Sequence, residues 1–168
     1  MIFGLILTVI LLPFAGGLLL QLLKFKERKY KQFYIFSYVL LNTLLTYVLL
    51  SQGTTNLIRV INFAGEKLDF SFKIDGMSMV FAGLVATLWP LATLYSFPYM
   101  EHEHNGRVHE NIFYMFYTAT YGVTLGIAMS GNLLTMYCFY ELLTLVTVPL
   151  VMHTLTREAV HASRKYFY

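Results

Sequence analysis

The most constraining feature of this chain is a series of long runs that contain no charged residue. Three such runs cover residues 1–23, 33–50 and 77–100, and the stretch 111–156 contains a single formally charged side chain. A helix needs about 20 mainly apolar residues to cross the roughly 30 Å hydrocarbon core of a bilayer. Hydrophobic residues make up 57% of the 168 residues and charged residues only 12%, which excludes an ordinary soluble domain. The sequence therefore predicts an all-α polytopic membrane protein.

We expect a single membrane domain over residues 1–168, with five transmembrane helices and the start of a sixth. The five helices are expected at about residues 2–23, 33–50, 77–98, 112–130 and 133–153, and the start of the sixth at 159–168. Ten residues of helix cover about 15 Å, or half of the hydrocarbon core. Because unpaired backbone groups are costly in lipid, we expect another segment or a separate chain to complete the sixth helix.

The lysine and arginine residues fall mainly on one predicted side of the membrane. Nine follow the first, third and fifth predicted helices, five of them within residues 24–31, and three lie on the opposite side. The positive-inside rule then places the N-terminus outside a cell (inner) membrane and the basic cluster in the cytoplasm. The basic residues lie in the breaks between apolar runs, so the net charge of +3 does not indicate a nucleic-acid partner.

The connection at residues 54–75 has the pattern of a short extracytoplasmic β-hairpin. Apolar and polar residues alternate from Lys67 to Ile74, which is typical of a strand with one covered face. Residues 62–66 contain a glycine and suit the turn between two strands. Asp75 follows this segment and is expected to be the N-cap of the third helix, where its carboxylate accepts backbone N–H groups.

Glu141 is the one formally charged residue between Asn111 and Thr156. It lies about ten residues after the Gly131-Asn132 break, or roughly 15 Å along a helix, and therefore near the bilayer midplane. A charged side chain there costs at least about 2.5–3.5 kcal/mol, and such residues usually mark proton or ion paths. Glu141 is thus a candidate proton carrier. The alternative is a protonated strut that hydrogen-bonds two helices.

Other candidate residues are less distinctive. His153, near the cytoplasmic end of the fifth predicted helix, is a candidate link between Glu141 and bulk water. Three histidines within residues 101–110 suggest a zinc site, but one loop supplies no rigid second shell, so we expect a solvated loop and no metal. Gly122 and Gly126 have the spacing that lets a neighbouring helix approach closely.

Several motifs together resemble the N-terminal part of one membrane-protein family. These are Asp75-Gly76-Met77-Ser78 at the start of the third helix, the run from Gly131-Asn132 to Glu141, and Arg164-Lys165-Tyr166-Phe167 at the sixth. The chain resembles the antiporter-like subunits shared by complex I, membrane-bound hydrogenases and Mrp-type cation/proton antiporters. The resemblance covers most of the chain from about residue 60 onward.

The resemblance implies that Glu141 pairs with a lysine on a later, broken helix and that the pair gates proton transfer. Lys165 and His153 become candidate connections toward the cytoplasm. The implied function is part of a proton- or sodium-translocating subunit in a larger membrane complex, and the alternative is a non-transporting structural or assembly subunit. The implied partners are other membrane subunits, including the segment that supplies this lysine. Redox cofactors would lie in other subunits, so no cofactor and no redox chemistry is expected in this chain.

Overall fold

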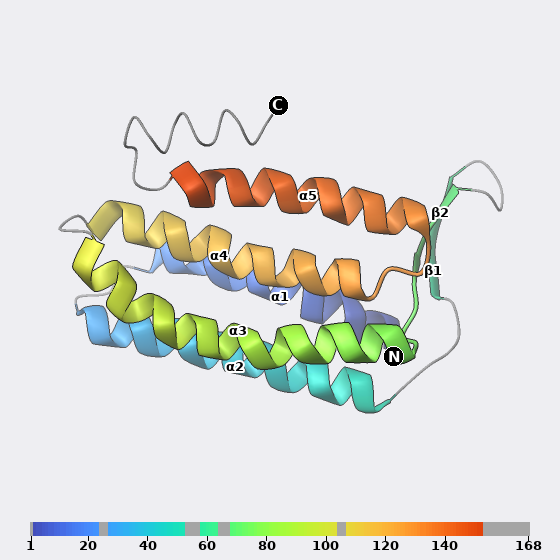
Figure 1. Ribbon diagram of the computed structural model, residues 1–168, viewed down its shortest axis with the longest axis horizontal. Coiled ribbons are helices and arrows are strands. Elements are labelled where there is room, and N and C mark those ends of the chain that lie inside the picture. Colours follow the sequence, from blue (N-terminus) through green and yellow to red (C-terminus); the bar gives the residue numbers. More distant parts are fainter. Residues whose placement is uncertain (1, 24–26, 53–57, 64–67, 104–106, 153–168) are drawn as a thin grey trace.

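The computed structural model describes residues 2–23, 27–52, 58–63, 68–103 and 107–152, which form five helices and two strands (Figure 1). The helices are α1 (Ile2–Leu22), α2 (Arg28–Ser51), α3 (Gly76–Glu103), α4 (Arg107–Ala128) and α5 (Leu133–Met152). The strands are β1 (Ile58–Phe63) and β2 (Leu68–Phe72). The helices run side by side, and the two strands lie across one end of the bundle, which we call the sheet end. We call the opposite end, where α2 and α4 begin, the charged end.

Four of the described helices are long and apolar enough to cross a membrane: α1, α2, α3 over Gly76–Met100 and α5 over Leu133–Leu150. The prediction of a polytopic, mainly helical membrane protein is therefore confirmed. α4 is less apolar, because it begins with polar residues and contains three threonines and three tyrosines among its apolar residues. A membrane crossing by α4 stays a prediction.

Three helices extend further at the charged end of the bundle than the sequence predicts. α2 begins at Arg28 rather than at residue 33, α3 ends at Glu103 rather than at 98, and α4 begins at Arg107 rather than at 112. The predictions stopped each helix near its last uncharged residues. α2 and α4 continue because Lys31 of α2 and Glu110 of α4 form a buried ion pair instead of facing solvent.

The helices pack as neighbours in a defined order, and α5 lies at the edge of the bundle (Figure 1). α1 packs on α4 and α2, α3 packs on α2 and α4, and α5 packs on α4 and β2. Gly122 allows the close approach of α1, because a Cβ at this position would collide with the carbonyl of Ile10. The predicted packing role of this glycine is confirmed.

The two strands pair in an antiparallel ladder from Ile58–Phe72 to Phe63–Leu68, with an irregularity between Arg59 and Ile61. The turn was predicted at residues 62–66, but residues 62 and 63 belong to β1, and residues 64–67 lie outside the described residues. β2 also binds the connection between α4 and α5. The Lys73 N–H donates to the Met129 carbonyl at 2.9 Å, and the Gly131 N–H donates to the Ser71 carbonyl at 2.7 Å.

Asn132 joins this connection to the start of α5. Its Oδ1 accepts a hydrogen bond from the Thr135 backbone N–H at 2.8 Å, and its Nδ2 donates to the Asp69 carbonyl and, at 3.1 Å, to the Asp69 carboxylate. The Ser71 N–H donates to the Thr135 Oγ1 at 3.0 Å. The first turn of α5 is therefore bonded directly to β2, which determines where α5 begins.

Asp75 is the N-cap of α3, as predicted. Its Oδ1 accepts the Ser78 backbone N–H at 2.9 Å, and the Lys73 Nζ lies 3.5 Å from its other oxygen. The hydrogen bond from the Ser78 backbone is the main reason that the pKa of the Asp75 carboxyl lies below its ordinary value, and Lys73 contributes less.

Candidate functional site

Glu141 lies within α5, eight residues after the helix begins at Leu133. At 1.5 Å per residue this is roughly 12 Å from the start of a helix that is about 30 Å long. Glu141 is the only formally charged residue of α5, and its side chain is exposed on the surface of the bundle.

The exposed side chains of α5 lie on one face of the helix. Besides Glu141, they are Leu133 (76% exposed), Met136 (42%), Tyr137 (57%), Tyr140 (57%) and Leu145 (57%). Their spacing of three and four residues matches the 3.6-residue period, so they form a continuous stripe. We call this stripe the open face of α5. No other described helix or strand covers it.

The opposite face of α5 packs on α4 and determines the direction of Glu141. Phe139 fills the space beside Gly126, where a Cβ would lie 2.5 Å from the ring. Val146 is buried in a cluster with Ala119 and Val123 of α4. Since Phe139 and Val146 face α4, Glu141 points away from the bundle, and Gly126 brings α4 and α5 together as predicted.

The described polar neighbours of Glu141 are uncharged. The Thr144 hydroxyl donates to the backbone carbonyl of Glu141 at 2.7 Å and does not reach the carboxylate. The side chain of Tyr137, one turn earlier, interacts with the Glu141 carboxyl. Among the described residues, no lysine or arginine forms an ion pair with Glu141.

The other predicted site residues are not placed. His153 and Lys165 lie outside the described residues, and so does His104 of the histidine-containing loop. Their roles stay predictions.

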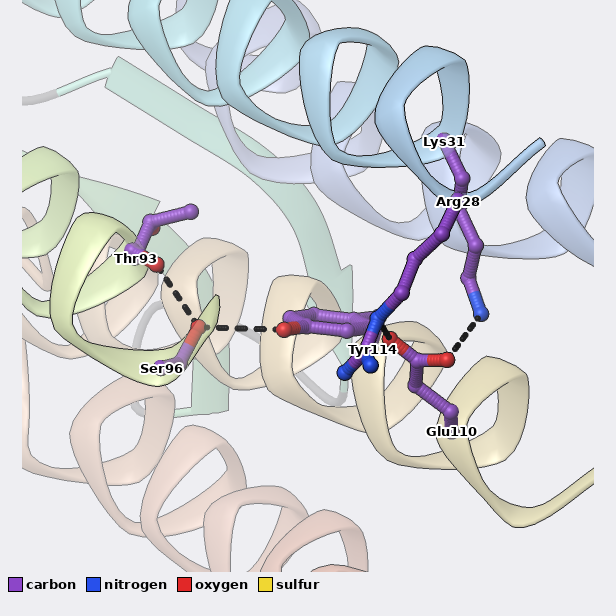
Figure 2. Close-up of polar contacts among 6 residues, drawn as sticks. All are labelled: Arg28, Lys31, Thr93, Ser96, Glu110 and Tyr114. Atoms are coloured by element: carbon purple, nitrogen blue, oxygen red, sulfur yellow. Dashed lines mark hydrogen bonds and ion pairs between the residues drawn. The ribbon is translucent and has the colours of Figure 1, made fainter. Parts of the chain in front are cut away.

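A second polar site, which the sequence analysis missed, lies at the charged end of the bundle (Figure 2). The Lys31 Nζ lies 3.1 Å from the Glu110 Oε2, and both side chains are only 9% exposed. The Arg28 Nε lies 3.4 Å from the Glu110 Oε1, with the Arg28 side chain 35% exposed. The Lys31 ammonium also lies 5.9 Å from the ring centroid of Tyr114, a favourable cation–π distance. We call Arg28, Lys31 and Glu110 the charged cluster.

Helical spacing is the signal that could have identified this cluster. Lys31, Ile35, Val39 and Asn42 recur every three or four residues and are all buried on one face of α2. Glu110, Tyr114, Tyr117 and Tyr121 recur in the same way on α4. Lys31 and Glu110 carry opposite charges, and each begins such a stripe at the same end of its helix. They were therefore candidates for an ion pair.

Parts of this chain are similar to known subunits of antiporters and of NAD(P)H-quinone oxidoreductases. Residues 61–108 match a family described as "NADH-Ubiquinone oxidoreductase (complex I), chain 5 N-terminus". A Na(+)/H(+) antiporter subunit from Alkalihalophilus pseudofirmus is 32% identical over 91 residues, which cover 54% of this chain. The resemblance to the antiporter-like subunits is confirmed.

Two further relatives show how widely the resemblance extends. Subunit 5 of the chloroplastic NAD(P)H-quinone oxidoreductase of Mutisia acuminata is 31% identical over 101 residues, or 60% of this chain. A Na(+)/H(+) antiporter subunit from Staphylococcus aureus is 24% identical over 155 residues, or 89% of this chain. The matched part of this chain spans only 11% to 19% of the length of these three relatives.

Proposed function

We propose that this chain forms the N-terminal part of a proton- or sodium-translocating antiporter-like subunit, in which Glu141 carries a proton within the membrane. The observation that carries the proposal is the position of Glu141, the one charged residue of α5, on the open face of that helix. A carboxyl group at this depth is costly in lipid and is usually retained for proton or ion transfer.

The exposure of Glu141 on the open face of α5 also supports the inference that another segment binds there. Lipid cannot hydrogen-bond a carboxylate, so intramembrane acidic residues normally face protein or water. Tyr137 and Tyr140 add two further polar groups beside Glu141 on this face. We infer that a later segment or another subunit covers the open face and supplies a lysine that pairs with Glu141.

The test is Glu141→Gln in the assembled complex. Glutamine keeps the shape and most of the hydrogen bonds of glutamate but cannot exchange a proton. We expect normal assembly and loss of ion pumping, measured in sealed vesicles together with the amount of assembled complex. Glu141→Asp is expected to keep part of the activity, because it retains the carboxyl group but withdraws it by one methylene.

Leu145→Gln is the matched control, because Leu145 lies one turn from Glu141 on the same face and is 57% exposed. It introduces the same amide without removing a carboxyl, so we expect it to leave pumping largely intact. Normal pumping by assembled Glu141→Gln complex would disprove the carrier role. The alternative, a non-transporting structural or assembly subunit, would then be the better account.

We also propose an orientation with the N-terminus outside and the charged end of the bundle in the cytoplasm. The excess of lysine and arginine in the segments at that end supports it. Cysteines introduced at Lys29, Asn105 and Asn56 test it in intact cells. An impermeant thiol reagent should label the cysteine at position 56 and not the other two, and the reverse pattern would invert the topology.

A further inference from the structure

A proline inside the membrane span of α3 leaves one backbone carbonyl without its usual partner. Pro90 lies near the middle of the candidate span Gly76–Met100. It has no N–H to donate to the carbonyl of Ala86, four residues earlier. A free carbonyl inside a membrane bundle is costly unless another group binds it. Ala86 is completely buried, so the group that binds its carbonyl has to come from a neighbouring helix.

α2 supplies this group. The Thr43 hydroxyl donates to the Ala86 carbonyl at 3.3 Å, and it also lies 2.9 Å from the Tyr121 hydroxyl of α4. Thr43 has a single hydroxyl proton, so Tyr121 is the donor in the second contact when Thr43 donates to Ala86. We call the hydrogen bond from Thr43 to the Ala86 carbonyl the latch. The latch replaces, from another helix, the backbone hydrogen bond that Pro90 removes.

Before Pro90, α3 is hydrogen-bonded to α2. Besides the latch, the Tyr47 hydroxyl of α2 lies 2.6 Å from the Thr87 Oγ1 and 3.4 Å from the Gly83 carbonyl. The groups of α3 that α2 binds are thus at Gly83, Ala86 and Thr87, within one turn of helix. These contacts hold the sheet-end part of α3 on α2.

From Trp89 onward, α3 is hydrogen-bonded to α4. The Tyr117 hydroxyl lies 3.4 Å from the Trp89 carbonyl and 3.2 Å from the Thr93 hydroxyl. One turn later, the Ser96 Oγ lies 3.4 Å from the Tyr114 hydroxyl (Figure 2). The hydrogen-bonding partner of α3 therefore changes from α2 to α4 directly before the proline.

The backbone of α3 is weakest where its partner changes. A helix bends at an interior proline, because one hydrogen bond is missing and the ring pushes against the preceding turn. The part of α3 nearest the charged end turns toward the beginning of α4 (Figure 1). Met100 in this part packs with Tyr114 and with Ile35 of α2, an apolar contact that can shift without breaking a hydrogen bond.

We propose that Pro90 is a hinge in α3 and that the latch limits its movement. The part of α3 before Trp89 moves with α2, and the part after Pro90 moves with α4. Since α5 packs on α4, the open face and Glu141 lie on the α4 side of this hinge. A segment that binds the open face and shifts α4 would displace the charged-end part of α3 and leave the sheet-end part in place. This last consequence rests on the proposed function, whereas the hinge does not.

The hinge is tested by spin-label distances in the assembled complex in membranes, with Cys138→Ser as the background. A label at Leu44 of α2 is paired with one at Leu84, before the hinge, or at Tyr95, after it. These side chains are 58%, 53% and 74% exposed. We expect a narrow distance distribution for the Leu44–Leu84 pair and a broader one for the Leu44–Tyr95 pair. Equal widths for the two pairs would overturn the hinge.

Two substitutions change the hinge in opposite directions. Pro90→Ala restores an N–H that can bind the Ala86 carbonyl, so it should narrow the Leu44–Tyr95 distribution and leave the Leu44–Leu84 distribution as it is. Thr43→Val removes the latch and should broaden the Leu44–Tyr95 distribution further. Thr43→Ser keeps the hydroxyl and should match the native complex. A Leu44–Tyr95 width that neither Pro90→Ala nor Thr43→Val alters would overturn the proposal.

The latch itself is tested by hydrogen exchange of the assembled complex, read by mass spectrometry on peptides that span residue 90. Thr43→Val should accelerate exchange in these peptides, and adding Pro90→Ala should remove the acceleration, because the restored N–H takes the place of the Thr43 hydroxyl. Thr46→Val is the matched control and should not accelerate exchange. Thr46 is also buried on α2, but its hydroxyl donates to the Asn42 carbonyl of its own helix. Equal acceleration by Thr43→Val with and without Pro90→Ala would overturn the latch.

The hinge and the proposed function fail in different experiments. If the two label pairs differ in width as expected but Glu141→Gln pumps normally, the hinge stands and the proposed function fails. If Glu141→Gln abolishes pumping but the two pairs have equal widths, the proposed function stands and the hinge fails.

Discussion

The ring of Phe139 lies against the backbone of Gly126, in the space that a Cβ on residue 126 would occupy. This contact brings α5 onto α4 by its Phe139 face and so turns Glu141, two residues later, toward the open face. The spacing of two residues on a helix separates side chains by about 200°. A glycine on one helix therefore sets the direction of a carboxyl group on another.

Gly126→Ala should destabilise the packing of α4 on α5. The added methyl would lie 2.5 Å from the Phe139 ring, so the two helices must separate or the ring must move. Overpacking of this kind costs about 1–3 kcal/mol. We expect that loss in SDS-induced unfolding, and a partial recovery in the double variant Gly126→Ala/Phe139→Leu. Gly83→Ala is the control, since the nearest atom to its Cβ would be 3.8 Å away. Equal effects of the two substitutions would argue against the contact.

Lys31→Met should be strongly destabilising because it leaves the buried Glu110 carboxylate with Arg28 as its one described partner. Removing one member of a buried pair costs up to about 3–5 kcal/mol. The double variant Lys31→Met/Glu110→Leu removes both charges and should recover much of the loss. A double-mutant cycle on the free energy of unfolding measures this coupling. Additive effects would show that the two side chains do not interact.

Asp75 should make stability depend on pH in the acid range. Its folded-state pKa lies below its ordinary value of 3.8, chiefly because the carboxylate accepts the Ser78 N–H. A lowered folded pKa stabilises the protein above the unfolded pKa, and this stabilisation is lost as the pH falls through the folded pKa. Asp75→Asn keeps the capping acceptor but removes the titration, so its melting temperature should fall less below about pH 4. Asp75→Ala should lower stability at neutral pH as well. An unchanged acid profile in Asp75→Asn would contradict this assignment.

Asn132→Ala should loosen the first turn of α5. It removes the acceptor for the Thr135 N–H and the donor to the Asp69 carbonyl. Loss of an N-cap of this kind costs about 0.5–2 kcal/mol. Hydrogen exchange of the amides at Thr135 and Met136 should accelerate, while exchange in α3 stays unchanged. Asn132→Asp is the comparison variant, because its carboxylate can still accept the Thr135 N–H but cannot donate to the Asp69 carbonyl. If both substitutions leave exchange at Thr135 unchanged, β2 does not hold α5 through Asn132.

His153→Ala tests the predicted connection between Glu141 and bulk water. Because a helix-end histidine is one of several routes to solvent, we expect slower pumping rather than the loss expected for Glu141→Gln. His104→Ala is the control from the predicted solvated loop and should be close to neutral. Pumping assays on assembled complex distinguish the two. Equal effects of the two substitutions on pumping would mean that His153 does not connect Glu141 to bulk water.

The sequence alone determined the membrane class, the order of the helices and the status of Glu141 as the one charged residue in its apolar stretch. These follow from apolar runs and from single residues such as Asp75, whose capping role needs only neighbours three residues away. The resemblance to the antiporter-like subunits was also readable from local motifs. Charge-based boundaries were less reliable, because Lys31, assigned to the basic cluster before the second predicted helix, lies within α2 and is buried against α4.

Only the tertiary structure decided which side chains meet. The ion pair of Lys31 with Glu110 and the contact of Tyr121 with Thr43 join residues 79 and 78 positions apart, on helices whose packing order the sequence does not state. The outward direction of Glu141 likewise depends on which face of α5 packs on Gly126. Lipid stabilises apolar surface on every side of a helix. Hydrophobicity therefore predicts that a helix enters the membrane but not which other helices it packs against. Small residues and buried polar pairs determine which helices pack together, and their contacts form only when the helices meet.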